Sequence, residues 1–389
     1  MHNRLAATIL TGTLCVPSTI AMQRPSTVVV GPVPLRADTV SETASMTAAR
    51  AAHTATALLD GDVLVVGGFT GQEGDLAGTD LYDQRHERFE RLVGSGVLRQ
   101  SQTATRLRDG RVLIAGGMGE RNQYLETAEL YDPATRTFSM TGPMSRARSG
   151  HEAVMLADGR VLIVGGVGTG WTFLASAELY DPATGSFTAA NDMREAREGH
   201  AAVRLRDGRV LVTGGHRGRG SATVVSCTAE IFDPATGRFS GTGSMARRRH
   251  KHDAVTVEDG RVLVLGGADE RDQNGVYDDV EVFDPARDAF RAGRPMHTGR
   301  YKFRGTSLLM ADGGLLLAGG AAQAERYDPA TGDSELVGGA DHLTGQFSAA
   351  APLPRGRVLI TGGYGRGRGP GSEAWVFHSS SGSGAPVER

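Results

Sequence analysis

Cysteine is scarce in this chain, whose 389 residues include only Cys15 and Cys227. Cys15 lies in an apolar N-terminal stretch that has the pattern of an export signal. Removal of that stretch would leave Cys227 as the only thiol. A framework of intrachain disulfides is therefore excluded as a source of stability.

Long apolar segments and an excess of charge are also missing. Outside the N-terminal stretch, no segment approaches the roughly 20 apolar residues that a membrane-spanning helix requires. The 42 basic residues nearly balance the 44 acidic ones, and the formal net charge is −2. Overall charge therefore gives no reason to expect nucleic acid or an anionic membrane as a partner.

The N-terminus carries a targeting pattern. Residues 2–21 begin with a weakly basic region, continue with an apolar stretch over 5–16 and end in the small-residue site Thr19-Ile20-Ala21. This order predicts a signal peptide and a secreted or periplasmic protein; the alternative is a disordered N-terminal extension. Residues 22–36, with three prolines and no repeat pattern, are interpreted as a linker.

What the chain does have is one block of sequence that occurs seven times. In residues 158–166 it reads Asp-Gly-Arg-Val-Leu-Ile-Val-Gly-Gly, a turn dipeptide followed by apolar residues and paired glycines. The seven pairs, 43 to 53 residues apart, begin at Gly67, Gly116, Gly165, Gly214, Gly266, Gly319 and Gly362. A repeat of that length determines the architecture, so it is interpreted before any local feature.

The apolar run of each block predicts a strand that is covered on both faces. Asp-Gly suits a type I′ turn between antiparallel strands, and residues 161–164 are apolar at consecutive positions. Burying four such side chains contributes roughly 6–12 kcal/mol, whereas ordering the backbone costs about 1–2 kcal/mol for every residue of the repeat. One repeat therefore cannot fold alone and needs a neighbour on each face.

The rest of each repeat predicts three more strands. Residues 151–156 precede the turn; after the glycines come a loop, the strand 177–181, an Asp-Pro-Ala-Thr-Gly turn and a short strand through Phe187. Pro presets φ in such a turn, and Gly takes its left-handed position. Four antiparallel strands per repeat, repeated radially, predict an all-β, seven-bladed β-propeller over residues 37–378.

The two ends of the repeat region complement one another. Residues 38–46 align with 136–144, the fourth strand of a repeat, whereas the seventh repeat stops after its third strand at 373–377. We therefore expect the N-terminal segment to supply the outer strand of blade seven, which removes open sheet edges. The Ser/Gly-rich residues 379–389 are expected to be a disordered tail.

The repeat resembles the kelch repeat. The shared features are an Arg three residues before a His, a strand, a turn, apolar residues, Gly-Gly, then Glu-x-aromatic-Asp-Pro and an aromatic strand. The resemblance covers residues 37–378 and implies a propeller of galactose-oxidase-like architecture. It is specific for the fold but not for function, since kelch propellers serve as enzymes, adaptors and adhesins.

One face of the propeller is expected to bind. Strands one and two form a hairpin, so the loops that enter strand one and those that follow Gly-Gly lie at the same rim, which we call the loop face. The opposite face, the turn face, carries the stereotyped turns. Binding residues usually lie on loops of varied length and chemistry over a rigid scaffold, which favours the loop face.

Two columns of residues recur at the loop face. Counted back from the glycine pairs, they are Arg50, Arg99, Arg148, Arg197, Arg249, Lys302 and Gly345 at seventeen residues, and His53, Gln102, His151, His200, His252, Gly305 and Ser348 at fourteen. A ring of cations could bind carboxylate or sulfate groups; the resemblance implies this use, because some kelch adaptors bind acidic peptides through such arginines. Alternatively, the arginines belong to the repeat and pair with acids such as Glu129 or Glu178.

Residues outside the columns add candidates on the same face. Arg217, Arg219 and Arg366 contribute to a basic excess that could attract an acidic ligand or could be an ordinary solvated surface. Trp171 could stack on a sugar or cover blade three. The full set of candidate binding residues is Arg50, Arg99, Arg148, Trp171, Arg197, His200, His216, Arg217, Arg219, Arg249, His252, Tyr364 and Arg366.

The sequence offers little for catalysis. His250-Lys251-His252 could form part of a metal site with His200 or His216, but a zinc or copper site would need three converging histidines. Copper-radical oxidases of this architecture use tyrosine and histidine ligands and a cysteine cross-linked to tyrosine. Here Cys227 and Tyr277 are the cross-link candidates, and there is no Tyr-His ligand pair. We therefore expect no cofactor, and we assign no catalytic or metal-binding residue.

Together these features predict a non-catalytic binding or scaffold module, expected to be a monomer. Its loop face would recognise a protein segment or an acidic glycan. The alternative is a carbohydrate-active enzyme, of isomerase or lyase type, that uses the same face. A fold that hosts many functions leaves this choice to the chemistry of the site.

Overall fold

The computed structural model of this chain describes residues 38–71, 75–94, 97–339, 342–343, 345–365 and 367–380. The predicted signal peptide and linker lie outside these residues, as does most of the predicted tail.

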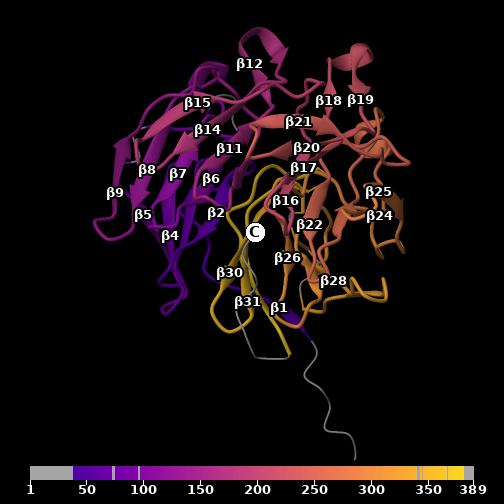
Figure 1. Cartoon of the computed structure of the whole chain (residues 1–389). Coiled ribbons are helices and arrows are strands. Elements are labelled where there is room, and N and C mark those ends of the chain that lie inside the picture. Colours follow the sequence, from indigo (N-terminus) through magenta and orange to yellow (C-terminus); the bar gives the residue numbers. More distant parts are fainter. Residues whose placement is uncertain are drawn as a thin grey trace, which may run out of the picture. The chain divides into compact units, whose positions relative to one another are not determined.

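Seven four-stranded antiparallel sheets surround a common axis (Figure 1), which confirms the predicted all-β, seven-bladed propeller. Innermost strands of neighbouring blades contact one another near this axis. Blades one to four consist of β2 (Thr54–Ala57), β3 (Val63–Val66), β4 (Thr79–Asp83) and β5 (Arg88–Leu92); β6 (Thr103–Arg106), β7 (Val112–Ala115), β8 (Ala128–Asp132) and β9 (Thr137–Met140); β10 (Glu152–Met155), β11 (Val161–Val164), β14 (Ala177–Asp181) and β15 (Ser186–Ala189); and β16 (Ala201–Arg204), β17 (Val210–Thr213), β20 (Ala229–Asp233) and β21 (Arg238–Gly241). Blades five to seven consist of β22 (Asp253–Thr256), β23 (Val262–Leu265), β24 (Val280–Asp284) and β25 (Ala289–Ala292); β26 (Ser307–Leu309), β27 (Leu315–Leu317), β28 (Glu325–Tyr327) and β29 (Ser334–Leu336); and β30 (Ala349–Leu353), β31 (Arg357–Thr361), β32 (Ala374–His378) and β1 (Thr39–Glu42).

The second strand of each blade is sandwiched between two neighbouring sheets. In β11, Leu162 and Val164 pack in a cluster that contains side chains of β17 in blade four. Val161 and Ile163, on the other face of β11, pack in a cluster that contains side chains of β7 in blade two. The run of consecutive apolar residues therefore has the physical reason that its pattern predicts, burial on both faces.

The paired glycines lie where the backbones of adjacent blades approach closely. Gly165 has a φ of +67°, and a Cβ atom on it would lie 2.8 Å from the carbonyl oxygen of Arg197 in the next blade. It would also lie 2.6 Å from Cε1 of His200. Only glycine meets both the conformational and the steric requirement at this position.

Short hairpins and turns lie on the loop face. After the glycines, β12 (Val167–Gly168) pairs with β13 (Thr172–Phe173), and β18 (His216–Arg217) pairs with β19 (Val224–Val225). In the described part of the chain, the helical elements are the single 3-10 turns η1 (Glu120–Asn122), η2 (Thr169–Trp171), η3 (Gly220–Ala222) and η4 (Asp272–Asn274). Within the described ranges, no helix has the length and apolarity needed to cross a membrane.

The N-terminal strand closes the ring, as predicted. β1 pairs antiparallel with β32 in a register that places Val40 opposite Phe377. Val40 is buried with Trp375 and Phe377, and its backbone N–H also donates to the carbonyl oxygen of Gly338 in blade six, at 2.9 Å. Strand β1 thus joins the two ends of the propeller without a covalent bond.

We expect deletion of residues 22–45 to lower the melting temperature by more than about 5 °C, because β32 becomes an exposed edge and the Val40 contacts are lost. Thermal unfolding followed by circular dichroism measures the change, with deletion of residues 381–389 as the control. A 22–45 deletion that melts like the full chain would show that β1 does not hold the ring closed.

Candidate binding surface on the loop face

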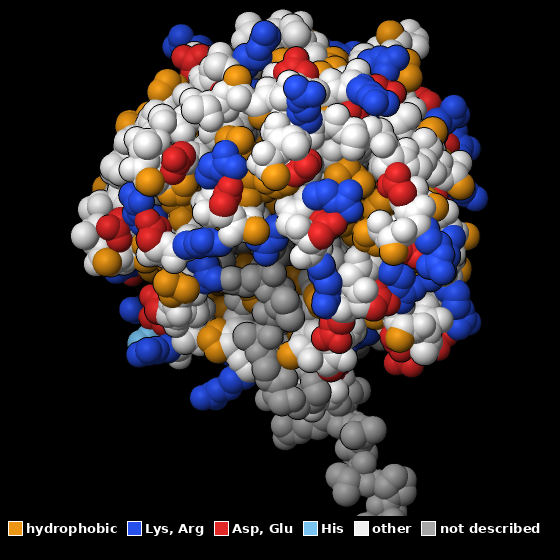
Figure 2. Space-filling model, viewed as in Figure 1, with side chains coloured by type: hydrophobic (Ala, Val, Ile, Leu, Met, Phe, Trp, Pro, Cys, Tyr) orange, Lys and Arg blue, Asp and Glu red, His pale blue; other side chains and the backbone are white. Residues whose placement is uncertain are grey.

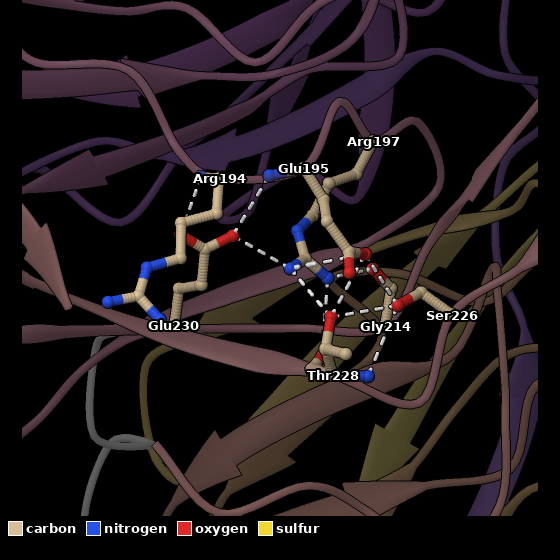
Figure 3. A network of polar contacts seen from close by, with 7 residues as sticks. All are labelled: Arg194, Glu195, Arg197, Gly214, Ser226, Thr228 and Glu230. Atoms are coloured by element: carbon tan, nitrogen blue, oxygen red, sulfur yellow. Dashed lines mark hydrogen bonds and ion pairs between the residues drawn. The ribbon is translucent and has the colours of Figure 1, made fainter. Parts of the chain in front are cut away.

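The arginine column lies inside the blades. Arg197, shown in Figure 3, donates from Nη1 to the carbonyl oxygens of Gly214 at 2.8 Å and Thr228 at 3.2 Å. Its Nη2 donates to Glu230 Oε1 at 2.8 Å. This side chain thereby ties the loop that enters blade four to the end of its second strand and to its third strand.

The same buried pair recurs in six blades. Ion pairs of 2.7–3.1 Å join Arg50 to Asp80, Arg99 to Glu129, Arg148 to Glu178, Arg197 to Glu230, Arg249 to Glu281 and Arg300 to Glu325. Each of these arginines is at most 1 % exposed. Burial lowers the pKa of the Arg148 guanidinium, and the Glu178 carboxylate opposes this shift.

These contacts correct the expected cationic ring. The structure does not present the guanidinium groups at the rim, because the blade itself already uses their donors. The candidate residues to which this applies are Arg50, Arg99, Arg148, Arg197 and Arg249. The structure therefore agrees with the second interpretation of this column, in which each arginine is part of the repeat and pairs with a neighbouring acid.

Blade six departs from the spacing of the sequence columns. Its buried arginine is Arg300, which donates to the carbonyl oxygen of Gly319, and Phe303 takes the place that histidine has in other blades. A turn at Arg304 and Gly305 adds two residues before β26. Counting back from the glycines therefore assigned Lys302 and Gly305 to the wrong columns.

The histidine column is buried between blades. Nε2 of His53, His151 and His252 lies 2.8–3.0 Å from the hydroxyl oxygen of a threonine of the adjacent blade. His200 packs against Gly165, and burial lowers its pKa to about 3. His200 and His252, two of the candidate binding residues, are therefore neutral interior side chains at neutral pH.

A ring of left-handed residues surrounds the mouth of the central channel on the loop face. Its members, one per blade, have φ between 51° and 63° and are Ala52, Ser101, Gly150, Gly199, Lys251, Lys302 and Phe347. The N–H groups of six of them donate to the carbonyl oxygen of the preceding member at 2.6–3.1 Å. This mouth ring holds the first residues of neighbouring blades side by side.

A chain of titratable groups crosses the loop face beside the mouth ring. Nδ1 of His216 lies 3.2 Å from Nδ1 of His250. Nε2 of His216 is 3.2 Å from Glu198 Oε2, and Nε2 of His250 is 3.4 Å from Asp272 Oδ1. Burial lowers the pKa of His216 to about 4, so its imidazole is neutral near pH 7.

Tyr301 and Lys251 complete this cluster. The Tyr301 hydroxyl donates to Asp272 and accepts from Lys251 Nζ at 3.1 Å. The contact with His250, followed by the bond from Tyr301, lowers the pKa of the Asp272 carboxyl, and burial raises the pKa of Tyr301. Each of these groups thus has a partner within the cluster. We interpret the cluster as a support for the surrounding loops.

Lys302 is different, since its ammonium group lies among aromatic rings. Nζ is 5.1 Å from the ring centre of Tyr301, 5.2 Å from Phe347 and 5.5 Å from Tyr364, and it donates to the Tyr364 hydroxyl at 2.8 Å. Burial lowers the pKa of Lys302, although the more distant Asp272 and Glu198 oppose this shift. Among the described residues, Lys251 Nζ lies 3.6 Å from Asp272 Oδ1, whereas Lys302 Nζ forms no ion pair.

Arg304 reaches across the channel from blade six to blade three. Its Nη1 donates to the carbonyl oxygen of His151 at 2.7 Å and lies 3.2 Å from Glu152 Oε1. These contacts link two blades that are not neighbours in the ring.

The structure brings some predicted site residues together and separates others. Trp171, His216, Arg217, Arg219 and Tyr364 lie on the loop face, whereas Arg366 is outside the described residues. The candidate set drawn from the sequence omits Glu198, Lys251, Asp272, Tyr301, Lys302 and Phe347, although Lys302 was counted in the column of cations. Several of them share a position in the sequence, one or two residues after the repeat arginine, and this position could have identified them.

The histidines and the Cys227–Tyr277 pair that were weighed as candidates for a metal site or a cross-link point in different directions. His250 turns toward His216, whereas His252 turns inward to Thr213, so two histidines converge and not three. Cys227 packs against the core of blade four, and the Tyr277 hydroxyl points to Asp269. Among the described residues, no three His, Cys, Asp or Glu side chains are grouped to hold a metal ion.

The surface charge is mixed. On the face seen in Figure 2, basic and acidic side chains alternate between apolar ones, and no large patch of one sign appears.

Comparison with known proteins agrees with this architecture. The Kelch motif matches residues 103–145 and 147–194. A structure titled "Novel fungal alcohol oxidase with catalytic diversity among the AA5 family, in complex with copper" is similar with a TM-score of 0.69 and 14 % identity. The similarity covers 90 % of this chain and 79 % of that one and, at such low identity, concerns the fold alone. No curated protein matches the sequence significantly.

We expect Arg148→Met to destabilise the protein by about 3–5 kcal/mol, because Glu178 would remain buried without its cation. Urea unfolding measures the loss. Arg146→Met, at an exposed arginine two residues earlier, is the matched control, and adding Glu178→Leu to Arg148→Met should recover much of the loss. If the Arg148→Met protein is as stable as the control, the structural role of the pair is contradicted.

We expect His200→Gln to reduce the acid sensitivity of the protein. The folded-state pKa of about 3 lies below the unfolded value of about 6.5. The contribution of His200 to the free energy of unfolding is thus fully present above pH about 6.5. It is lost as the pH falls toward the folded-state pKa, by up to about 1.4 kcal/mol for each pH unit. Gln102 occupies the same position in blade two, so glutamine fits there.

Urea midpoints at neutral and mildly acidic pH provide this measurement, with the exposed His297→Gln as the control. If His200→Gln and the control lose stability equally on acidification, His200 does not contribute to the pH dependence.

Proposed function

We propose that this seven-bladed propeller, in which residues 103–145 and 147–194 match the Kelch motif, is a binding module that holds an acidic segment of a partner protein on its loop face. Propellers of this repeat are suited to a scaffold role, since a rigid ring presents variable loops on one side. The finer assignment, an acidic segment at the mouth ring, rests on the chemistry of particular side chains.

The observation that carries this proposal is the environment of Lys302. Its half-buried ammonium has aromatic rings on three sides and one hydrogen bond, to Tyr364. An ammonium has three donors, so it can still donate to a ligand. A carboxylate placed over the mouth ring would satisfy a cation that is already fixed and partly desolvated, which is the condition for a strong charge-assisted bond.

A protein segment fits the surface better than a glycan does. Trp171 is the natural stacking platform for a sugar, but the Arg219 guanidinium lies 3.3 Å from the centre of its ring. Tyr124 approaches the same indole edge-on, with ring centres 6.0 Å apart. The open aromatic face that a pyranose ring requires is thus partly occupied.

The alternative of a carbohydrate-active enzyme has less support from the geometry. The imidazoles of His216 and His250 face each other through Nδ1 and face carboxylates through Nε2. A general base needs a nitrogen that can reach the substrate proton, and here all four ring nitrogens are directed at protein groups. We therefore infer that this cluster supports the loops of a binding surface.

We further propose that the protein acts outside the cytoplasm, since residues 2–21 carry the order of regions found in a signal peptide. An extracellular module of this kind would meet its partner as a folded, monomeric propeller.

We expect Lys302→Met to weaken binding to acidic peptides by about tenfold or more, the usual loss for a hydrogen bond between charged groups. The probe is an array of synthetic peptides graded by Asp and Glu content, each paired with its Asn and Gln counterpart. Arg287→Met, at an exposed arginine of the turn face, is the control for lost positive charge. Equal binding of acidic and amide peptides by the unchanged protein would rule out the proposed ligand.

A further inference from the structure

A second cation on the loop face, Arg219, has no carboxylate partner among the described residues. Arg219 is exposed, and its Cζ lies over the indole of Trp171, 3.3 Å from the ring centre. Among the residues that the structure describes, the side chains of Arg219 and Arg217 make no hydrogen bond or ion pair. The turn-face arginines behave otherwise, because each of four pairs with the aspartate two residues before it: Arg111, Arg160, Arg209 and Arg261. The donors of Arg219 are thus available in a way that those of the repeated arginines are not.

The platform under Arg219 is held in an unusual conformation. Trp171 is 44 % exposed and has a φ of +61°, a region that bulky residues rarely adopt. Its indole is supported by the edge of Tyr124. Exposed apolar surface and a strained backbone at one loop tip are features that accompany binding sites more often than plain surface.

Trp171 and Lys302 belong to one continuous surface. Phe173, in the same hairpin as Trp171, packs edge-on against His216 with ring centres 5.6 Å apart. His216 contacts His250, whose ring centre is 5.8 Å from that of Tyr301. Tyr301 in turn forms one wall around Lys302. The contacts run without a break across blades three to six.

We propose that Arg219, stacked on Trp171, is a second oxyanion subsite, and that the partner segment carries two anionic side chains, one for Lys302 and one for Arg219. This rests on the function proposed above. A planar guanidinium fixed by stacking can bind a carboxylate or a phosphate through two parallel N–H bonds, and stacking on the indole limits its motion before the ligand arrives.

The test uses synthetic Gly/Ser peptides titrated against the full chain by fluorescence anisotropy. One series carries a single Glu, a second carries two Glu at graded separations, and a third replaces the second Glu with phosphoserine. The variants are Arg219→Gln, Trp171→Leu, their double variant and Lys302→Met. Arg238→Gln, an exposed arginine in the same blade, is the matched control.

We expect a second anion to strengthen binding, and we expect Arg219→Gln to remove that gain, about tenfold, without affecting the single-Glu peptide held by Lys302. Trp171→Leu should reduce the same gain, and the double variant should lose no more than Arg219→Gln alone, since the two residues act together. A larger gain with phosphoserine than with Glu would identify a phosphorylated segment as the source, and equal gains would identify carboxylate.

The outcomes separate the two proposals. If Lys302→Met weakens binding but the gain from a second anion survives Arg219→Gln, or if no second anion brings a gain, the Arg219 subsite is wrong and the Lys302 site stands. If Arg219→Gln removes the gain while Lys302→Met changes nothing, the subsite stands and the assignment of Lys302 falls.

Discussion

The buried pair between the repeat arginine and a third-strand carboxylate is the interaction on which the loop face depends. In blade four, Arg197 joins the entering loop to Gly214, Thr228 and Glu230 at once. Two residues later the chain takes the left-handed turn of the mouth ring, which hydrogen-bonds to the next blade. A desolvated guanidinium is costly, but here its forked donors meet several acceptors, so the loop is fixed where it would otherwise move.

Side chains on the loop face are available for binding only where the repeat does not use them in these buried contacts. At the mouth ring and at the residue before it, blades one and three carry Ala51, Ala52, Ser149 and Gly150, which are small. Blades four to six carry Glu198, His250, Lys251, Tyr301 and Lys302 at the same positions. The ring is therefore structurally symmetric but chemically one-sided, and the candidate surface lies on the side where the variation is.

Parts of this arrangement follow from sequence alone, and others do not. The glycine spacing predicts the blade number, and the match of 38–46 to a fourth strand predicts the closure by β1. The pairing of Arg99 with Glu129 was one of two interpretations that the spacing left open. The place of Lys302 was misjudged because the turn at Arg304 and Gly305 shifts the register of blade six, and counting residues cannot detect a turn before its strand is seen.

The sequence by itself determined the strands, the turns and the ring of seven, because runs of consecutive apolar residues and paired glycines have few other ways to be buried. Only the tertiary structure decided which polar side chains remain available. The arginine and histidine columns look like a binding rim along the chain, yet adjacent blades bury them. Lys302 and Arg219 remain open because no neighbouring blade, among the described residues, supplies them with a carboxylate, and such proximity is set by packing between blades.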